Sequence, residues 1–402
     1  MSSRVYVAIT AALLLGGCDG FTFGNAVVGP LPEPYQGPGD MLCGDIDACA
    51  AYLPEEPERW TPPVDPLVGA GCGELVQYAL TGDAALHPMA MIEGLLTEPQ
   101  TGEGPLELRC IEIAIEVPET SSSFELDLRA ATLEGVRISI HSEVPGRVLL
   151  GTVGAVSASE FVLRGPLDIV ADRAVVWGAR IEMLPSRSLA PAGSLMALET
   201  QFRQLEVAGS GSVAMRRSSL NEALVHANVL RSELCPWATT TVVASSVEVF
   251  EANLWQVHVE TEHFIAAAGA IRFSEFVECN EIILAAVTVN QTRFGLTDVP
   301  ILLSSAMILN SYVEADLTGS ARVVQSALLS HSIDFEGGAI ANSSLCGVDI
   351  LAIAVGDATC LRCDAGAPAD VCVSEHEEPL CPGFETASCS RGPRAQINRT
   401  GI

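Results

Sequence analysis

The stretch from Leu106 to Val355 is rich in strand-like segments and has no convincing amphipathic helix, which constrains the fold more than any other feature. It is a succession of short segments rich in Val, Leu, Ile and Ala, separated by Gly, Ser, Asn and Asp. The first, LELRCIEIAIEV, alternates apolar and polar residues with one phase slip at Cys110 and Ile111, which indicates a strand that bulges or turns there. Because an ordinary parallel sheet needs crossover helices, two all-β folds remain: sandwiches or barrels, and a solenoid of stacked coils.

Apolar residues recur at intervals of five, and this favours the solenoid. The clearest run is Val249, Leu254, Val259 and Phe264, and we expect Leu254 and Val259 to point inward. The quintets EANLW and EADLT resemble the consensus of pentapeptide-repeat proteins, in which four quintets make one square coil of a right-handed β-helix. Since the runs stop after a few steps, we expect an irregular right-handed parallel β-helix with coils of about 20 residues, on the order of eleven in all. The alternative is a pair of β-sandwiches.

The flanking segments differ in composition, and we expect them to cover the open ends of the solenoid, whose unpaired strand edges favour aggregation. Short helices are predicted near residues 41–53 and 73–96. The Pro- and Gly-rich stretch from Gly24 to Asp40 is typical of an extended tether. The predicted organisation is a signal peptide (1–17), a tether (18–40), a small helical, disulfide-bearing cap (41–105), a parallel β-helix (106–355) and a cysteine-rich C-terminal segment (356–402).

The N-terminus predicts secretion. Arg4 precedes an unbroken apolar run, Val5–Leu15, which is too short to span a membrane, and two glycines then lead into Cys18. The LGGC motif resembles the lipobox of bacterial lipoproteins, in which the cysteine becomes the first residue of the mature chain and receives a diacylglyceryl group and usually a further acyl chain. The resemblance implies that Cys18 anchors the protein in the cell envelope, at the outer membrane or cell surface or on the periplasmic face. The alternative is an ordinary signal peptide with an incidental cysteine.

The cysteine count fits this destination. Setting Cys18 aside leaves twelve of the thirteen cysteines, an even number, in a chain that reaches an oxidising compartment. Ten of them, in two groups near the ends of the chain, are candidates for disulfides: Cys43, Cys49, Cys72, Cys110, Cys346, Cys360, Cys363, Cys372, Cys381 and Cys389. The other two, Cys235 and Cys279, are separated by about two coils, so they should bond only if one lies in a protruding loop.

Charge and composition exclude several functions. The formal net charge is −29, and such a surface repels phosphate backbones, so we expect no nucleic-acid partner. The chain contains no lysine, which excludes a Walker lysine, a Schiff base to a pyridoxal cofactor and a kinase-type lysine. We expect no cofactor.

Motifs that suggest chemistry are few, and each has a plainer explanation. Cys360 and Cys363 form a CxxC, but neither a redox helix nor a second zinc-binding pair follows, so structural disulfides are expected. The segment HVETEH contains His258 and His263, which would point to opposite faces of a strand. Neither GxSxG nor HExxH occurs. We therefore expect neither catalytic residues nor a metal site.

Two classes of function remain. The first is a lipid-anchored envelope protein with a non-enzymatic structural or interaction role, whose partner is an envelope polysaccharide or a protein. The second is a carbohydrate-active β-helix enzyme, a hydrolase or lyase, in which two carboxylates on neighbouring coils would act as general acid and base. The absence of lysine and the 5% aromatic content favour the first class.

Overall fold

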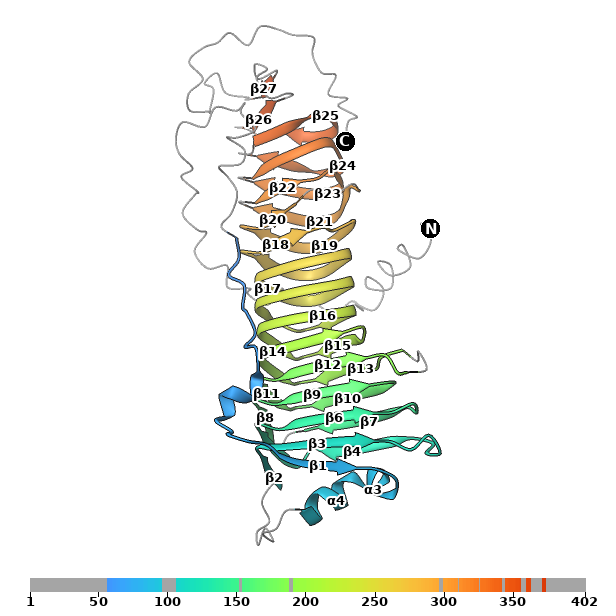
Figure 1. Cartoon of the computed structure of the whole chain (residues 1–402). Helices are drawn as coiled ribbons and strands as arrows, with labels where there is room; N and C mark the ends of the chain where they lie inside the picture. Colours follow the sequence, from blue (N-terminus) through green and yellow to red (C-terminus); the bar gives the residue numbers. More distant parts are fainter. Residues whose placement is uncertain are drawn as a thin grey trace, which may run out of the picture. The chain divides into compact units, whose positions relative to one another are not determined.

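The chain forms a parallel β-solenoid of about ten turns (Figure 1). This computed structural model describes residues 56–95, 106–151, 154–187, 191–295, 299–309, 311–324, 326–341, 344–355, 359–362 and 371–373. Within these ranges the strands pair in parallel, except that β26 (Thr359–Arg362) pairs antiparallel with β27 (Val371–Val373). The expected parallel β-helix is confirmed, and sandwiches, which require antiparallel ladders, are excluded. The right-handed sense stays a prediction.

Each coil contributes to three parallel ladders, and we call the sheet of each ladder a face. Face 1 begins with β2 (Leu106–Arg109), β5 (Ala131–Glu134), β8 (Ala155–Ser157) and β11 (Val175–Trp177). Face 2 contains β1 (Val76–Leu80), β3 (Ile111–Glu116), β6 (Arg137–His141), β9 (Glu160–Arg164), β12 (Arg180–Leu184), β18 (Glu275–Val277), β20 (Arg293–Phe294) and β22 (Tyr312–Glu314). Face 3 contains β4 (Phe124–Leu128), β7 (Gly146–Leu150), β10 (Leu167–Asp172), β13 (Ser194–Leu198) and β15 (Ser212–Arg216).

The remaining strands are longer because they bend around corners and contribute to more than one face. They are β14 (Gln201–Gly209), β16 (Ser219–Glu233), β17 (Trp237–Arg272), β19 (Glu281–Asn290), β21 (Ile301–Leu309), β23 (Leu317–Val324), β24 (Ala327–Ala341) and β25 (Ser344–Val355). Coil length varies along the chain: Arg137 binds Glu160, 23 residues later, Arg180 binds Glu206, 26 residues later, and the backbone of Ser218 binds Cys235, 17 residues later. The expected coil of about 20 residues lies between these values.

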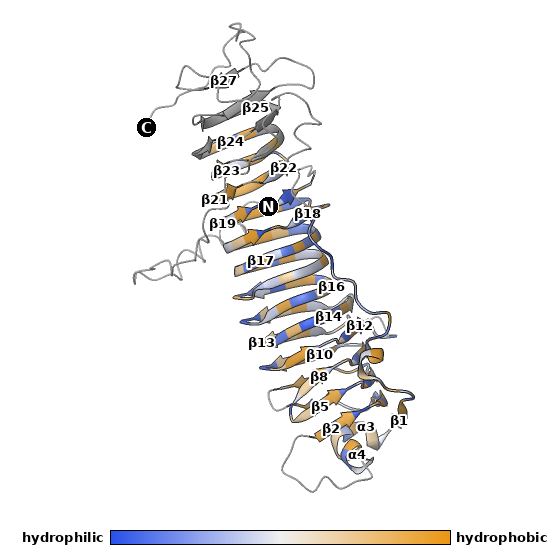
Figure 2. Ribbon diagram, turned by 90° about the vertical axis from the view of Figure 1, so that its left-hand side faces the viewer, coloured by the Kyte–Doolittle hydropathy of each residue, from blue (hydrophilic) through white to orange (hydrophobic). Residues whose placement is uncertain are grey.

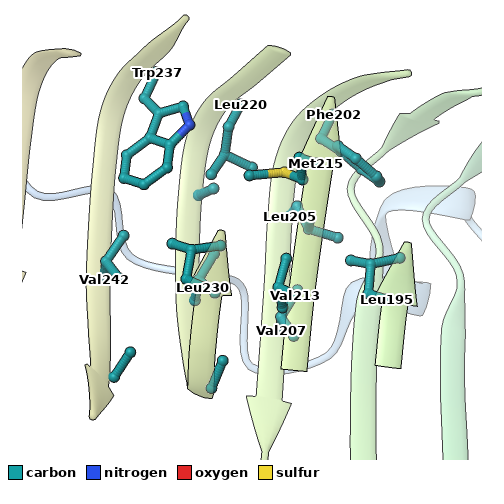
Figure 3. Packing of buried hydrophobic residues seen from close by; sticks show 14 of the residues in the cluster. Leu195, Phe202, Leu205, Val207, Val213, Met215, Leu220, Leu230, Trp237 and Val242 are labelled. Atoms are coloured by element: carbon teal, nitrogen blue, oxygen red, sulfur yellow. The ribbon is translucent and has the colours of Figure 1, made fainter. Parts of the chain in front are cut away.

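Inward-facing side chains from the three faces form one continuous core, part of which is drawn in Figure 3. Figure 2 shows that hydrophobic residues recur along the strands of successive coils. Leu254 and Val259 are 1% and 0% exposed, as predicted. They also explain the interval of five, because Leu254, Val259 and Phe264 occupy equivalent inward positions on faces 1, 2 and 3 in turn. A coil of 17 residues is not a multiple of five, so the run ends when the coil closes. The square coil of four quintets implied by the pentapeptide resemblance is therefore not the coil of this chain.

Two corners repeat with the same backbone geometry, the one between faces 3 and 1 and the one between faces 1 and 2. Where face 1 turns into face 2, successive coils place a residue with positive φ: Cys110, Gly135, Ala158, Gly178, Gln204, Glu222, Thr239, Gln256, Phe273 and Gln291. The phase slip predicted at Cys110 is this corner, with φ 54°. Most of these residues are not glycine, so the corner is imposed by the stacking of coils and costs each non-glycine residue about 1 kcal/mol.

Buried hydroxyl and thiol groups satisfy the backbone at the corners. Ser274 Oγ donates to the Arg272 carbonyl at 2.8 Å and accepts from the Val257 N–H of the preceding coil at 3.2 Å. Cys235 does the same at the corner between faces 3 and 1, where its thiol donates to the Glu233 carbonyl and accepts from the Ser218 N–H at 3.3 Å. Cys235 and Cys279 are free and buried, so they form no disulfide with each other.

The segment before the coils differs from the predicted helical cap. Residues 76–80 form strand β1, which pairs with β3, although a helix was predicted over 73–96. Pairing with a ready sheet edge overrides a weak local helix pattern. Helices α3 (Asp83–Leu86) and α4 (Pro88–Leu95) follow, and α4 contacts β4. In the part of the chain that the structure describes, no helix has the length and apolar character needed to cross a bilayer.

Residues 56–72, which we call the strap, lie along the outside of the coils (Figure 1, blue). The strap runs against the chain direction: Arg59 contacts Glu275 of a late coil, Arg180 contacts the Val64 carbonyl, and Cys72 is bonded to Cys110 of the first coil. A 3-10 helix, η1 (Pro66–Ala70), is capped by the Asp65 side chain. The strap passes so close to Gly135 that a Cβ there would lie 2.5 Å from the Cys72 sulfur.

We predict that Leu254→Asp destabilises the solenoid by about 3 to 5 kcal/mol, because it buries an unpaired charge between stacked coils. Asn253→Asp adds the same charge one residue earlier at an exposed position, and should change stability by less than about 0.5 kcal/mol. Urea unfolding followed by circular dichroism measures both. Equal losses for the two variants would contradict the inward position of Leu254.

Cys235→Ser should be tolerated within about 1 kcal/mol, because the hydroxyl can make both hydrogen bonds of the thiol. Cys235→Ala should cost about 1 to 3 kcal/mol, since it leaves the buried Ser218 N–H without an acceptor. The urea midpoints of the two variants test this difference. An alanine variant as stable as the serine variant would show that the thiol has no such role.

Candidate functional site

Ionisable residues recur regularly from coil to coil on the outer side of face 2, beneath the strap. One column, which we call the polar ladder, alternates in charge from coil to coil: Glu112, Arg137, Glu160, Arg180 and Glu206 occupy equivalent positions. Strand pairing places these side chains about 4.8 Å apart, so each arginine has a carboxylate on either side.

Short contacts link the members of the ladder. Arg137 Nε donates to Glu160 Oε2 and Arg180 Nε donates to Glu206 Oε2, both at 2.6 Å. Arg180 Nη1 also lies 3.8 Å from Glu160 Oε1, so Glu160 bridges two arginines. Each ion pair joins one coil to the next.

Further along face 2 the same column ends in a buried cluster around Glu275. This carboxylate contacts His258 Nδ1 at 3.0 Å, Arg59 Nη2 of the strap at 3.3 Å and Arg293 Nη1 at 3.4 Å. The side chains of His258 and Glu275 are 5% and 4% exposed. Two guanidinium groups surround one carboxylate, so the cluster carries excess positive charge when His258 is neutral.

That environment sets the protonation of His258. Burial, and secondarily the positive charge of Arg59, lowers the pKa of His258, and these effects outweigh the hydrogen bond to Glu275. Tyr312 occupies the next position of the column after Arg293, and burial raises its pKa. The Nε of Arg293 is buried without a hydrogen-bond partner among the described residues. The donors around Glu275 come from the protein itself, so the arrangement fixes the strap to the coils.

A second group of acidic residues lines an open depression of about 420 Å³ where face 2 turns into face 3. Glu260, Glu262 and Glu278 line it, together with His226. Among the described residues, no three His, Cys, Asp or Glu side chains converge as metal ligands would. If the protein were a carbohydrate-active enzyme, the carboxylates of this depression would be the candidates for its general acid and base.

The structure separates the two histidines of HVETEH. A corner lies between them, so His258 is on face 2 and His263 on face 3, and both point away from the core. His263 binds Glu281 at 3.0 Å in solvent, with half of its side chain exposed. The two histidines therefore lie on different faces of the solenoid because the chain turns between them, and the expected placement on opposite sides of a single strand is wrong.

The predicted cysteines divide into three sets. Cys72 and Cys110 form a disulfide across a sequence separation of 38, which fixes the strap to the first coil. The backbone of Cys346, Cys360 and Cys372 lies in described strands, and the register places Cys360 opposite Cys372. Outside the described residues lie the lipid-anchor candidate and the remaining disulfide candidates: Cys18, Cys43, Cys49, Cys363, Cys381 and Cys389.

Sequence reasoning missed the polar ladder and the strap. The ladder has a signal, alternating charge, but its spacing follows the coil length, which varies from one coil to the next. Arg59 had no signal at all, because its partner Glu275 is 216 residues away. Comparison with protein-family models, with curated proteins and with solved structures finds no match to this chain.

We predict that His258 makes stability depend on pH. The folded pKa lies below the usual value of about 6.5, so as the pH falls through that value the unfolded chain takes up a proton that folded His258 does not, and the free energy of unfolding falls. The contribution is fully present above about pH 6.5. Thermal unfolding at about pH 7.5 and 5.5 should therefore show a larger loss in the parent than in His258→Gln.

His263→Gln is the matched control, because its imidazole has a Glu partner at the same distance but is exposed. That variant should keep the pH response of the parent. An unchanged response in His258→Gln would contradict the role given to the buried imidazole.

Proposed function

We propose that this chain is a lipid-anchored envelope protein with a non-enzymatic structural or interaction role. The observation that carries the proposal is the use of the ionisable groups on face 2. The carboxylates of the polar ladder and of Glu275 bind arginines of neighbouring coils and of the strap. Because these carboxylates are already paired with arginines of the same chain, they stabilise face 2 and are not available to bind or convert a substrate.

The strap fits a tethered protein. The predicted tether, residues 18–40, precedes it in the chain, and the strap binds several coils in succession before ending at the disulfide of Cys72. A pull on the tether would be shared among these coils instead of acting on one end of the solenoid. Such load sharing suits a protein held at a membrane by its N-terminus.

The anchor is tested with Cys18→Ser. The lipobox resemblance predicts that the substitution abolishes incorporation of labelled fatty acid and moves the protein from the detergent phase to the aqueous phase. The parent chain, expressed in the same bacterium, should label and stay with the detergent. A mutant that still partitions with detergent would contradict the lipoprotein assignment.

Because of the acidic depression, the alternative function, a carbohydrate-active hydrolase or lyase, is also to be tested by experiment. Glu260, Glu262 and Glu278 are carboxylates of the kind that general acid–base cleavage of a polysaccharide needs. The proposed role predicts that the protein releases no reducing ends and no unsaturated sugars from envelope or plant polysaccharides. Release that is lost in Glu260→Gln or Glu262→Gln would favour the hydrolase or lyase instead.

A further inference from the structure

From Ala155 onward, face 1 differs in composition from the rest of this acidic chain, whereas the two strands before it carry Glu107 and Glu134 on outward positions. Each coil contributes a triplet whose middle residue points inward, and from residue 155 to residue 309 the triplets read AVS, VVW, QFR, SLN, PWA, NLW, AIR, TVN and MIL. The middle residues are 4% exposed or less. No outward position of these triplets holds Asp or Glu, although the chain contains 50 of them. At about 4.8 Å per coil, this surface extends for about 38 Å.

Two tryptophans stand on this surface. Trp177 and Trp255 are 55% and 53% exposed, and they occupy the same outward column four coils apart, or about 19 Å. Each exposed indole presents a flat apolar ring with a polar edge to solvent. Trp177 Nε1 donates to Gln204 Oε1 at 2.7 Å, which fixes the edge of the ring.

The groups around the tryptophans are small or apolar side chains, uncharged amides and two arginines. Gln201, Asn221 and Asn253 carry amides on the outward positions. Arg203 lies 3.6 Å from Glu222 at the corner, whereas Arg272, next to Trp255 in its column, has no ion pair with any described residue. The carboxylates that flank the face, such as Glu199, Glu222 and Glu251, lie on its corners.

We infer that face 1 binds a neutral polysaccharide that runs along the axis of the coils. This inference rests on the proposed non-enzymatic role and names its partner. Sugar rings have an apolar C–H face and a rim of hydroxyls, which match a flat indole bordered by amide and guanidinium donors. A protein partner would need anchoring pockets, and a flat sheet of triplets supplies none. A polyanion would be repelled by a chain of net charge −29, and two arginines do not offset that charge.

The test uses the full chain and defined probes: a mixed-linkage β-glucan, a xylan and a galactomannan, with polygalacturonate as the acidic comparison. Affinity electrophoresis and calorimetry should show binding to at least one neutral probe and weaker binding to polygalacturonate. Trp177→Ala and Trp255→Ala should each raise the Kd about tenfold, the size of one stacking contact, and the double variant should not bind. Both indoles are half exposed, so circular dichroism and Tm should stay close to those of the parent.

Met196→Ala is the matched control, because it removes an exposed apolar side chain from face 3. It should bind as the parent does. Binding to none of the neutral probes, binding to polygalacturonate alone, or a double variant that binds like the parent would overturn the inference. Reducing-end assays on the same mixtures test the proposed role separately: cleavage would refute the non-enzymatic role, whereas the two tryptophan variants still decide whether face 1 binds the chain.

Discussion

The geometry of the corner between faces 1 and 2 is the constraint on which the rest of the structure depends. Each coil must leave face 1 through one residue with positive φ, and most of these residues are not glycine. At several of these corners the next residue offsets the strain with side-chain hydrogen bonds, as Ser274 does by bonding to the backbone of Arg272 and of Val257 in the preceding coil. The corner keeps successive triplets in register. That register aligns the polar ladder of face 2 and the part of face 1, from residue 155 to residue 309, whose outward positions hold no carboxylate.

Charged pairs that are buried beneath the strap and charged pairs that are exposed to solvent contribute differently to stability. His258–Glu275 and His263–Glu281 have the same separation, 3.0 Å, but the first pair is buried and the second is exposed. Exposed pairs contribute little to stability because water and salt screen them, whereas breaking a buried pair leaves an uncompensated charge. Arg59 supplies the additional donor to Glu275, so the strap and the cluster depend on each other. The ion pairs on face 2 therefore hold neighbouring coils and the strap together, although the chain as a whole is strongly acidic.

Sequence patterns predicted the features that repeat within one coil. The inward positions of Leu254 and Val259 and the turn at Cys110 follow from local alternation, which a strand imposes on its own residues. Features that join distant segments were not predictable. The sequence of strand β1 has a helix-like pattern, but the segment pairs with β3 as a strand. Arg59 contacts Glu275 only because the strap crosses many coils. The polar ladder and the paired tryptophans emerge only when the coil register is known, since the spacing between coils varies along the chain.

Spin-label distances along face 1 test the coil register most directly. Ala155, Ser219 and Thr288 lie in one outward column, with Ser219 three coils and Thr288 seven coils from Ala155. At about 4.8 Å per coil, backbone separations of about 14 Å and about 34 Å are expected for the two pairs, in proportion to the number of coils. A separation between positions 155 and 288 no greater than that between 155 and 219 would contradict the stacked coils, and with them both the polar ladder and the binding surface.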